Sequence, residues 1–157
     1  MRSKFKKCCL FSVLFISVWL IITGMSFQDF PNAPKGIVIG SEWDSARREL
    51  TTVFPNQDFL DLGENGVRTV QLWTEIINCS NRELTWIVEY ETGLKQEILT
   101  QRIRYDRFRT YLEKTFRRNV WNKASNKSVD VSGECRIMII DKSESNAVIV
   151  EKKIILH

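Results

Sequence analysis

The sequence predicts a mainly β fold, in which an N-terminal transmembrane helix precedes an antiparallel β-sandwich-like domain. Two observations lead to this prediction. Residues 8–27 contain no charge, and twenty helical residues rise about 30 Å, the thickness of the hydrocarbon core of a bilayer. After residue 66, short segments alternate apolar and polar side chains between clusters of Gly, Asn and Ser. Such alternation is typical of strands with one buried face.

The basic residues at the N-terminus predict the orientation of the apolar run. The next charge after the run is Asp29, and four basic residues precede it, namely Arg2, Lys4, Lys6 and Lys7. Since positive charges are retained in the cytoplasm, residues 1–7 are predicted to form a cytoplasmic tail, residues 8–27 an anchor, and residues 28–157 an exported part. A signal peptide cleaved near residues 24–26 is the alternative to a permanent anchor. Both interpretations export the rest of the chain.

The charge of the exported part is balanced. The net charge of the whole chain is +4, but residues 28–157 carry 19 Lys and Arg against 19 Asp and Glu. The sequence pI of about 8.9 therefore reflects the N-terminal tail, and no nucleic-acid partner is predicted. The single histidine, His157, is the last residue, which argues against a histidine zinc site or a hydrolase triad. We predict no metal, no cofactor and no catalytic residues.

Cys79 and Cys135 are the cysteines of the exported part. An even number of cysteines outside the cytoplasm permits a disulfide, and we predict a bridge between these two. The bridge would close a loop of 56 residues, for which loop entropy gives about 4 kcal/mol of stabilisation. The alternative is a pair of independently buried thiols.

The exported part begins with a predicted linker. Residues 28–44 include two prolines and two glycines and are predicted to tether a β domain that spans residues 45–157. Residues 41–54 are ambiguous, because their apolar residues recur at helical spacing while residues 50–54 are β-branched and aromatic, as strands prefer. Pro55 ends the element in either case.

Alternation is clearest from residue 67 onward. A meander of consecutive antiparallel strands is predicted for residues 67–79, 83–91 and 94–104. Gly93 supplies the second turn, because glycine adopts a positive φ without strain. Residues 133–141 and 147–156 are predicted to form a C-terminal hairpin. Before this hairpin, residues 104–116 fit a helix or a strand, and residues 117–132 are predicted to be a mobile polar loop.

Four segments of the predicted strands carry a family resemblance. In chain order they are residues 86–93, 96–99, 107–111 and 133–141. This order resembles that of a small bacterial family, the domain of unknown function 2914, over most of residues 46–156. The chain departs from the family pattern at three positions, because Phe108, Tyr111 and Cys135 stand where the family has tryptophan.

The resemblance to this family implies a bacterial β domain, often behind a membrane anchor, with no known activity and no catalytic residues to transfer. It favours a strand rather than a helix for residues 107–112 and for residues 46–54. With the orientation predicted above, it implies a protein of the bacterial inner membrane whose N-terminus is cytoplasmic and whose C-terminal domain is periplasmic.

The sharpest local feature is a basic and aromatic stretch. Residues 101–123 contain eight basic and two acidic residues, interleaved with aromatic ones. Arginine binds carboxylate or phosphate with two parallel hydrogen bonds, and aromatic rings offer stacking faces. The alternative is a solvated sheet face whose arginines pair with Glu89, Glu91 and Glu97. The predicted binding residues are Arg102, Arg104, Tyr105, Arg107, Phe108, Arg109 and Tyr111.

These observations predict a non-catalytic binding or scaffolding module in the cell envelope, held at the membrane by a single-pass anchor. The expected partner is an envelope protein or an anionic lipid headgroup. The alternative is a hydrolase or modifying enzyme that acts on an envelope polymer through carboxylates, which requires a cleft with two carboxylates of raised pKa.

Overall fold

The computed structural model describes residues 36–47 and 49–157. The predicted cytoplasmic tail and the predicted anchor lie outside the described residues. In the part of the chain that the structure describes, no helix is long and apolar enough to cross a membrane.

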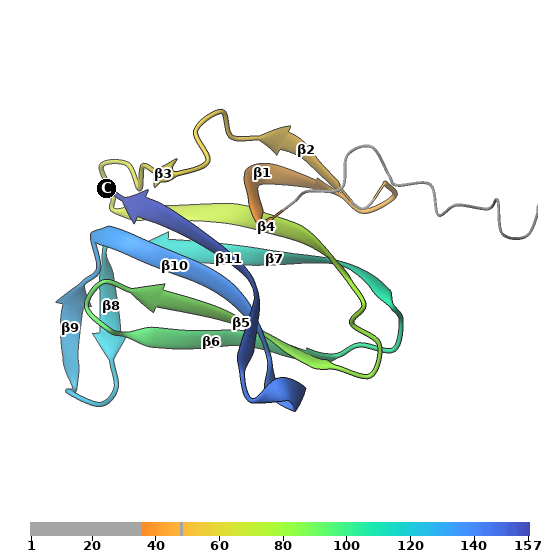
Figure 1. The fold of residues 1–157 in the computed structure, drawn as a ribbon. Helices are drawn as coiled ribbons and strands as arrows, with labels where there is room; N and C mark the ends of the chain where they lie inside the picture. The colour runs from red at the N-terminus through yellow and green to blue at the C-terminus, as the bar shows by residue number, and fades with distance from the viewer. Residues whose placement is uncertain (1–35, 48) are drawn as a thin grey trace, which may run out of the picture. The chain divides into compact units, whose positions relative to one another are not determined.

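Strands make up most of the described chain (Figure 1). A 3₁₀ helix, η1 (Lys142–Glu144), joins the last two of them. The strands are β1 (Val38–Asp44), β2 (Glu49–Val53), β3 (Phe59–Leu60), β4 (Val67–Ile77), β5 (Glu83–Tyr90), β6 (Lys95–Arg102), β7 (Arg107–Arg117), β8 (Asn119–Asn122), β9 (Lys127–Asp130), β10 (Gly133–Asp141) and β11 (Ala147–Leu156).

The strands form two larger sheets and one separate hairpin. Sheet A has the order β2-β1-β4-β7 and sheet B the order β3-β11-β10-β5-β6. All neighbours are antiparallel except β3 and β11, which pair in parallel over two residues. The β8–β9 hairpin belongs to neither sheet. Figure 1 shows sheets A and B as two facing layers, with the hairpin beside one end of them.

Sheets A and B bury their apolar faces against each other. Leu72 of β4 and Phe116 of β7 are fully buried, and so are Val88 of β5 and Ile137 of β10. Successive side chains of a strand point to opposite faces of its sheet, so the neighbours of each of these residues lie on the opposite face. The prediction of a mainly β, sandwich-like domain with antiparallel sheets is therefore confirmed.

The predicted meander is wrong, because β4 and β5 lie in different sheets. The connection between them, residues 78–82, carries the chain from sheet A to sheet B. Asn78 and Asn81 in this connection have φ values of 55° and 61°, which asparagine tolerates better than most residues. The second predicted turn is confirmed, since β5 and β6 pair around Gly93, whose φ is 79°.

The predicted linker boundary is also wrong. Residues 38–44 form β1, which pairs with both β2 and β4, so the β domain begins before residue 45. The sequence pattern places Gly40 in the linker. In the sheet, a Cβ on Gly40 would lie 2.1 Å from the carbonyl oxygen of Thr52, so glycine permits the close approach of β2 to β1. The ambiguous residues 41–54 contribute strands, not a helix.

The region predicted as a polar loop, residues 117–132, contains the β8–β9 hairpin instead. Val120 and Val129, which are paired across the hairpin, pack against the main core. Each of these two strands places a single valine on its core face, and this alternation is too weak to predict strands. The ambiguous residues 104–116 form most of β7, as the family resemblance favoured.

The predicted disulfide is wrong, because Cys79 and Cys135 are both free and buried. The Cys79 amide donates to the carbonyl of Asp106 over 3.3 Å, at the connection from β6 to β7. Cys135 lies opposite Tyr90, at the other end of β6. The eight residues of β6 span about 26 Å at roughly 3.3 Å per residue. Bridged cysteines have Cα atoms within about 7 Å of each other.

Candidate functional site

The seven predicted binding residues follow one continuous segment of the chain at one side of the sandwich. Arg102 ends β6, Arg104 and Tyr105 lie in the connection after it, and the remaining four lie in the first half of β7. Among the described strands, β6 is the last of sheet B and β7 the last of sheet A. The connection therefore joins the two sheets at their edges.

Arg107 and Arg109 are bound to Glu75, an acidic residue that the sequence pattern does not link to them. Both guanidinium groups donate from Nε to Oε1 of Glu75, with a distance of 3.3 Å for Arg109. Glu75 lies directly opposite Arg109 in the pairing of β4 with β7, and its side chain is 3% exposed. These two arginines therefore bind a carboxylate that is shielded from solvent on the outer face of sheet A.

The partners expected under the alternative interpretation are bound elsewhere. Glu89 pairs with Lys95 and Arg136, and Glu97 pairs with Lys142. Glu89 and Glu97 lie in strands of sheet B, and Glu91, which accepts a hydrogen bond from the Glu134 amide over 3.2 Å, follows β5 of that sheet, whereas β7 belongs to sheet A. The alternative was therefore correct in pairing Arg107 and Arg109 internally but wrong about the acid.

The charge of Glu75 is stabilised by its two arginines. Burial acts to raise the pKa of this carboxyl, but the hydrogen bonds and charges of Arg107 and Arg109 outweigh burial, so its pKa is lowered from 4.5. Glu75 consequently stays ionised at any pH near neutrality.

The stability that the ionised Glu75 contributes is expected to be lost in acid. Because its pKa in the folded protein lies below 4.5, the contribution is complete above that pH and disappears as pH falls through the lowered pKa. Urea unfolding of the full chain at a series of acidic pH values measures this loss. A Glu75→Gln variant should show a flatter pH dependence in the same window. Equal slopes for the two proteins would contradict the assignment.

Tyr111 packs within an aromatic cluster on the outer face of sheet A. Its ring stacks on Trp43, with centroids 4.3 Å apart and planes 19° apart, and Trp43 lies 6.4 Å from Trp73. Trp73 is 6% exposed although it points away from the core. The cluster covers the centre of β4, so Tyr111 has a packing role, while 47% of its surface remains exposed.

The other predicted residues line two adjoining pockets. One, of about 310 Å³, is lined by residues 101–105 and Phe108. The second, of about 360 Å³, is lined by Trp43, Ser45, Gln101 and residues 108–111. The pockets share Gln101 and Phe108, and we call them together the β6–β7 groove. Gln101 and Trp43 could not be predicted from the sequence, because their proximity to β7 depends on how the strands and sheets pack.

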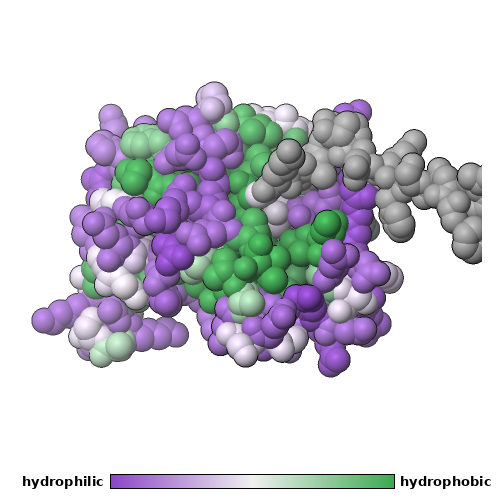
Figure 2. All heavy atoms as spheres, in the orientation of Figure 1, coloured by the Kyte–Doolittle hydropathy of each residue, from purple (hydrophilic) through white to green (hydrophobic). Residues whose placement is uncertain are grey.

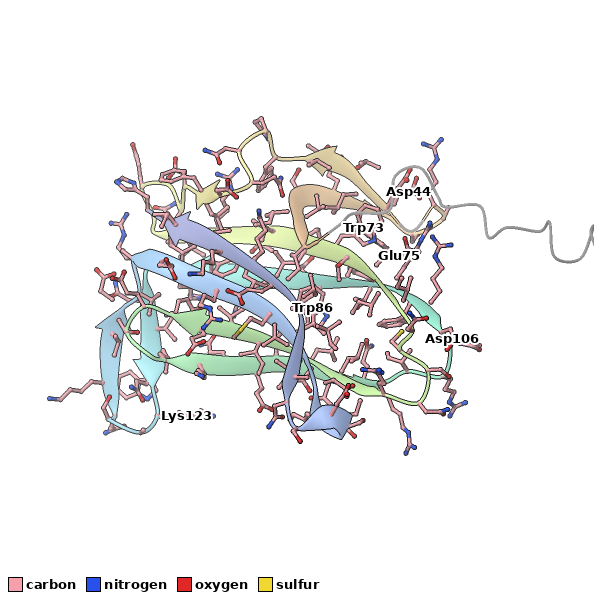
Figure 3. All side chains as sticks on the ribbon, in the orientation of Figure 1. Asp44, Trp73, Glu75, Trp86, Asp106 and Lys123 are labelled. Carbon is pink, nitrogen blue, oxygen red and sulfur yellow. The ribbon has the colours of Figure 1, made fainter. Side chains whose placement is uncertain are left out.

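Arg102 and Arg104 are the available cations of the β6–β7 groove. Among the described residues, no carboxylate lies within 4 Å of either guanidinium. Tyr105, between them and Phe108 in the chain, is 73% exposed. In Figure 3, Asp106 marks this end of the sandwich, and Trp86 marks its centre. The groove thus offers two guanidinium forks and an aromatic ring to a partner.

A second group of polar residues lies inside the sandwich. Lys114 donates to Oε1 of Gln96 over 2.8 Å, and the Tyr90 hydroxyl donates to the same oxygen over 3.4 Å. Burial lowers the pKa of Lys114 and raises that of Cys135 to about 12. The Cys135 thiol is therefore protonated at neutral pH and is a poor nucleophile. Lys114 belongs to this interior group rather than to the basic surface.

No group of three or more His, Cys, Asp or Glu side chains within residues 36–47 and 49–157 is placed to hold a metal ion. Comparison of the sequence with models of protein families and with curated proteins finds no match. The resemblance to the domain of unknown function 2914 family stays a prediction from the motifs named above.

Proposed function

We propose that this protein is a single-pass inner-membrane protein of the bacterial envelope, and that its β domain is a non-catalytic binding or scaffolding module on the periplasmic side. The partner is an envelope protein that presents acidic side chains. The observation that carries this proposal is the β6–β7 groove, where Arg102 and Arg104 lie beside the exposed ring of Tyr105 without an acidic partner in the described chain.

The shape of the groove favours a protein partner. Binding energy at protein interfaces concentrates on arginine and aromatic residues that meet in recessed, desolvated places. The β6–β7 groove combines both residue types with two pockets of about 310 and 360 Å³. Each charge-assisted hydrogen bond to a carboxylate contributes about 1.5–3 kcal/mol, so two arginines provide a substantial part of the affinity.

The hydrolase alternative has less support. It requires a carboxylic acid whose pKa is raised, as for a general acid. Hydrogen bonds from the amide and the side chain of Ser132 lower the pKa of Asp130, and those from Arg136 lower the pKa of Glu151. The pKa of Glu75 is lowered as well. These three carboxyl groups therefore all favour the ionised form, which accepts hydrogen bonds and donates none.

Removal of the two groove arginines is expected to abolish partner capture. A photoreactive amino acid at Tyr105 of the full chain should crosslink one recurrent acidic protein in intact membranes, identified by mass spectrometry. In an Arg102→Gln/Arg104→Gln background, the yield of that product should fall at least about tenfold.

The matched control is Lys123→Gln/Lys127→Gln, which also removes two positive charges, from exposed positions in the β8–β9 hairpin. This control should leave the crosslink yield unchanged. A product whose yield is the same in all three proteins, or the absence of any recurrent product, would refute the groove as the contact site.

A further inference from the structure

We propose that the β8–β9 hairpin is a second binding surface, which docks on anionic lipid headgroups. This inference goes beyond the proposed function of the β6–β7 groove. None of the residues that line the groove belongs to the hairpin.

The hairpin has one face on the core and one face in solvent. Val120 pairs with Val129, and both pack against the main core. Trp121 is next to Val120 and opposite Ser128, so its side chain points to the other face, where it is 58% exposed. The valines thus fix the hairpin on the sandwich, and the same geometry presents Trp121 to solvent.

The hairpin and its base are strongly basic. Residues 117–130 contain four basic residues and one acid, Asp130. Arg118 is close enough to Asp130 to contribute to lowering its pKa, after the hydrogen bonds from Ser132. The other three bases, Arg117, Lys123 and Lys127, are exposed and have no carboxylate within 4 Å among the described residues. In Figure 3, Lys123 lies at the turn of the hairpin, away from the two sheets.

The composition of the β8–β9 hairpin suits docking on a lipid surface better than insertion into a pocket of a protein. An energetically important tryptophan at a protein interface is normally enclosed by neighbouring contacts, whereas Trp121 stands on a projecting hairpin. A bilayer interface needs no complementary pocket, because the amphipathic indole ring settles at headgroup level. Figure 2 shows the projecting lower left of the molecule as largely hydrophilic, which favours docking on headgroups over deep insertion.

The charges supply the selectivity for anionic lipid. A lysine near an anionic membrane surface contributes about 1 kcal/mol, which is about fivefold in affinity. Lys123 and Lys127 together should therefore favour an anionic over a zwitterionic surface by about 25-fold, and salt should weaken this preference.

Vesicle flotation tests the inference. The full chain, held in nanodiscs of phosphatidylcholine, is mixed with vesicles of phosphatidylcholine alone or of phosphatidylcholine enriched in phosphatidylglycerol. The phosphatidylglycerol vesicles should carry the protein to the top of the gradient, and the others should not. The Lys123→Gln/Lys127→Gln variant should bind about 25-fold more weakly, and a Trp121→Ala variant should also lose binding.

The matched control for this experiment is Arg102→Gln/Arg104→Gln, which should bind the anionic vesicles as the unchanged protein does. Equal binding to both kinds of vesicle, or binding that depends on the groove arginines rather than on the hairpin lysines, would overturn the inference. The crosslink at Tyr105 is measured in a separate experiment. If the unchanged protein gives no recurrent crosslink but still binds the anionic vesicles selectively, only the proposed function is refuted. If it gives the crosslink but does not bind those vesicles selectively, only the lipid site is refuted.

Discussion

Replacing Arg107 and Arg109 together with methionine is expected to lower the free energy of unfolding by about 3–5 kcal/mol. Glu75, whose side chain is 3% exposed, receives hydrogen bonds from both guanidinium groups. Without them, a buried carboxylate must either stay ionised without its partners or take up a proton. Urea unfolding of the full chain at neutral pH, followed by tryptophan fluorescence, measures the loss.

Two further variants separate this effect from a general loss of arginine. Adding Glu75→Met to the double variant should recover most of the lost stability, because no buried charge then remains. Replacing Arg102 and Arg104 with methionine should change stability by less than about 0.5 kcal/mol, since both are exposed. Equal losses for the two arginine pairs would contradict the assigned role of Glu75.

Replacing Trp86 with alanine is expected to cost about 3–5 kcal/mol of unfolding free energy. Trp86 lies in β5 of sheet B, is 3% exposed, and its indole N–H donates to Oγ1 of Thr110 in β7 of sheet A over 3.4 Å. Truncation leaves a cavity between the sheets and removes this bond between them. Urea unfolding of the full chain measures the effect.

The same substitution at Trp121 provides the comparison, because Trp121 is 58% exposed. It should change stability by no more than about 0.5 kcal/mol. A similar loss at both positions would mean that Trp86 does not pack between the sheets as described.

The sequence predicted strands most accurately where alternation was strong and turns were well marked. The predicted segments 133–141 and 147–156 coincide with β10 and β11. β1 was missed because Gly36 and Gly40 read as linker residues, and β8 and β9 were missed because each contributes a single apolar residue to the core. Strand pattern is a local property, so its prediction fails where few side chains carry it.

The candidate site was predicted in part. The stretch from Arg102 to Tyr111 does lie together, because it is one continuous segment of the chain. Its division into bound and available arginines was not predicted. Glu75 precedes Arg107 by 32 residues, and nothing in the sequence near either residue indicates that β4 pairs with β7.

What the sequence determined by itself is the mainly β class, the positions of the strands β4, β5, β6, β10 and β11, and the basic, aromatic character of the segment after β6. Only the tertiary structure decided which strands are neighbours and that Cys79 and Cys135 lie apart. It also decided that Arg107 and Arg109 bind Glu75, while Arg102 and Arg104 remain available to a partner. The physical reason is that alternation specifies which face of a strand is buried but not against which strand. That choice follows from packing two complete apolar faces into one core, and it depends on residues far apart in the chain.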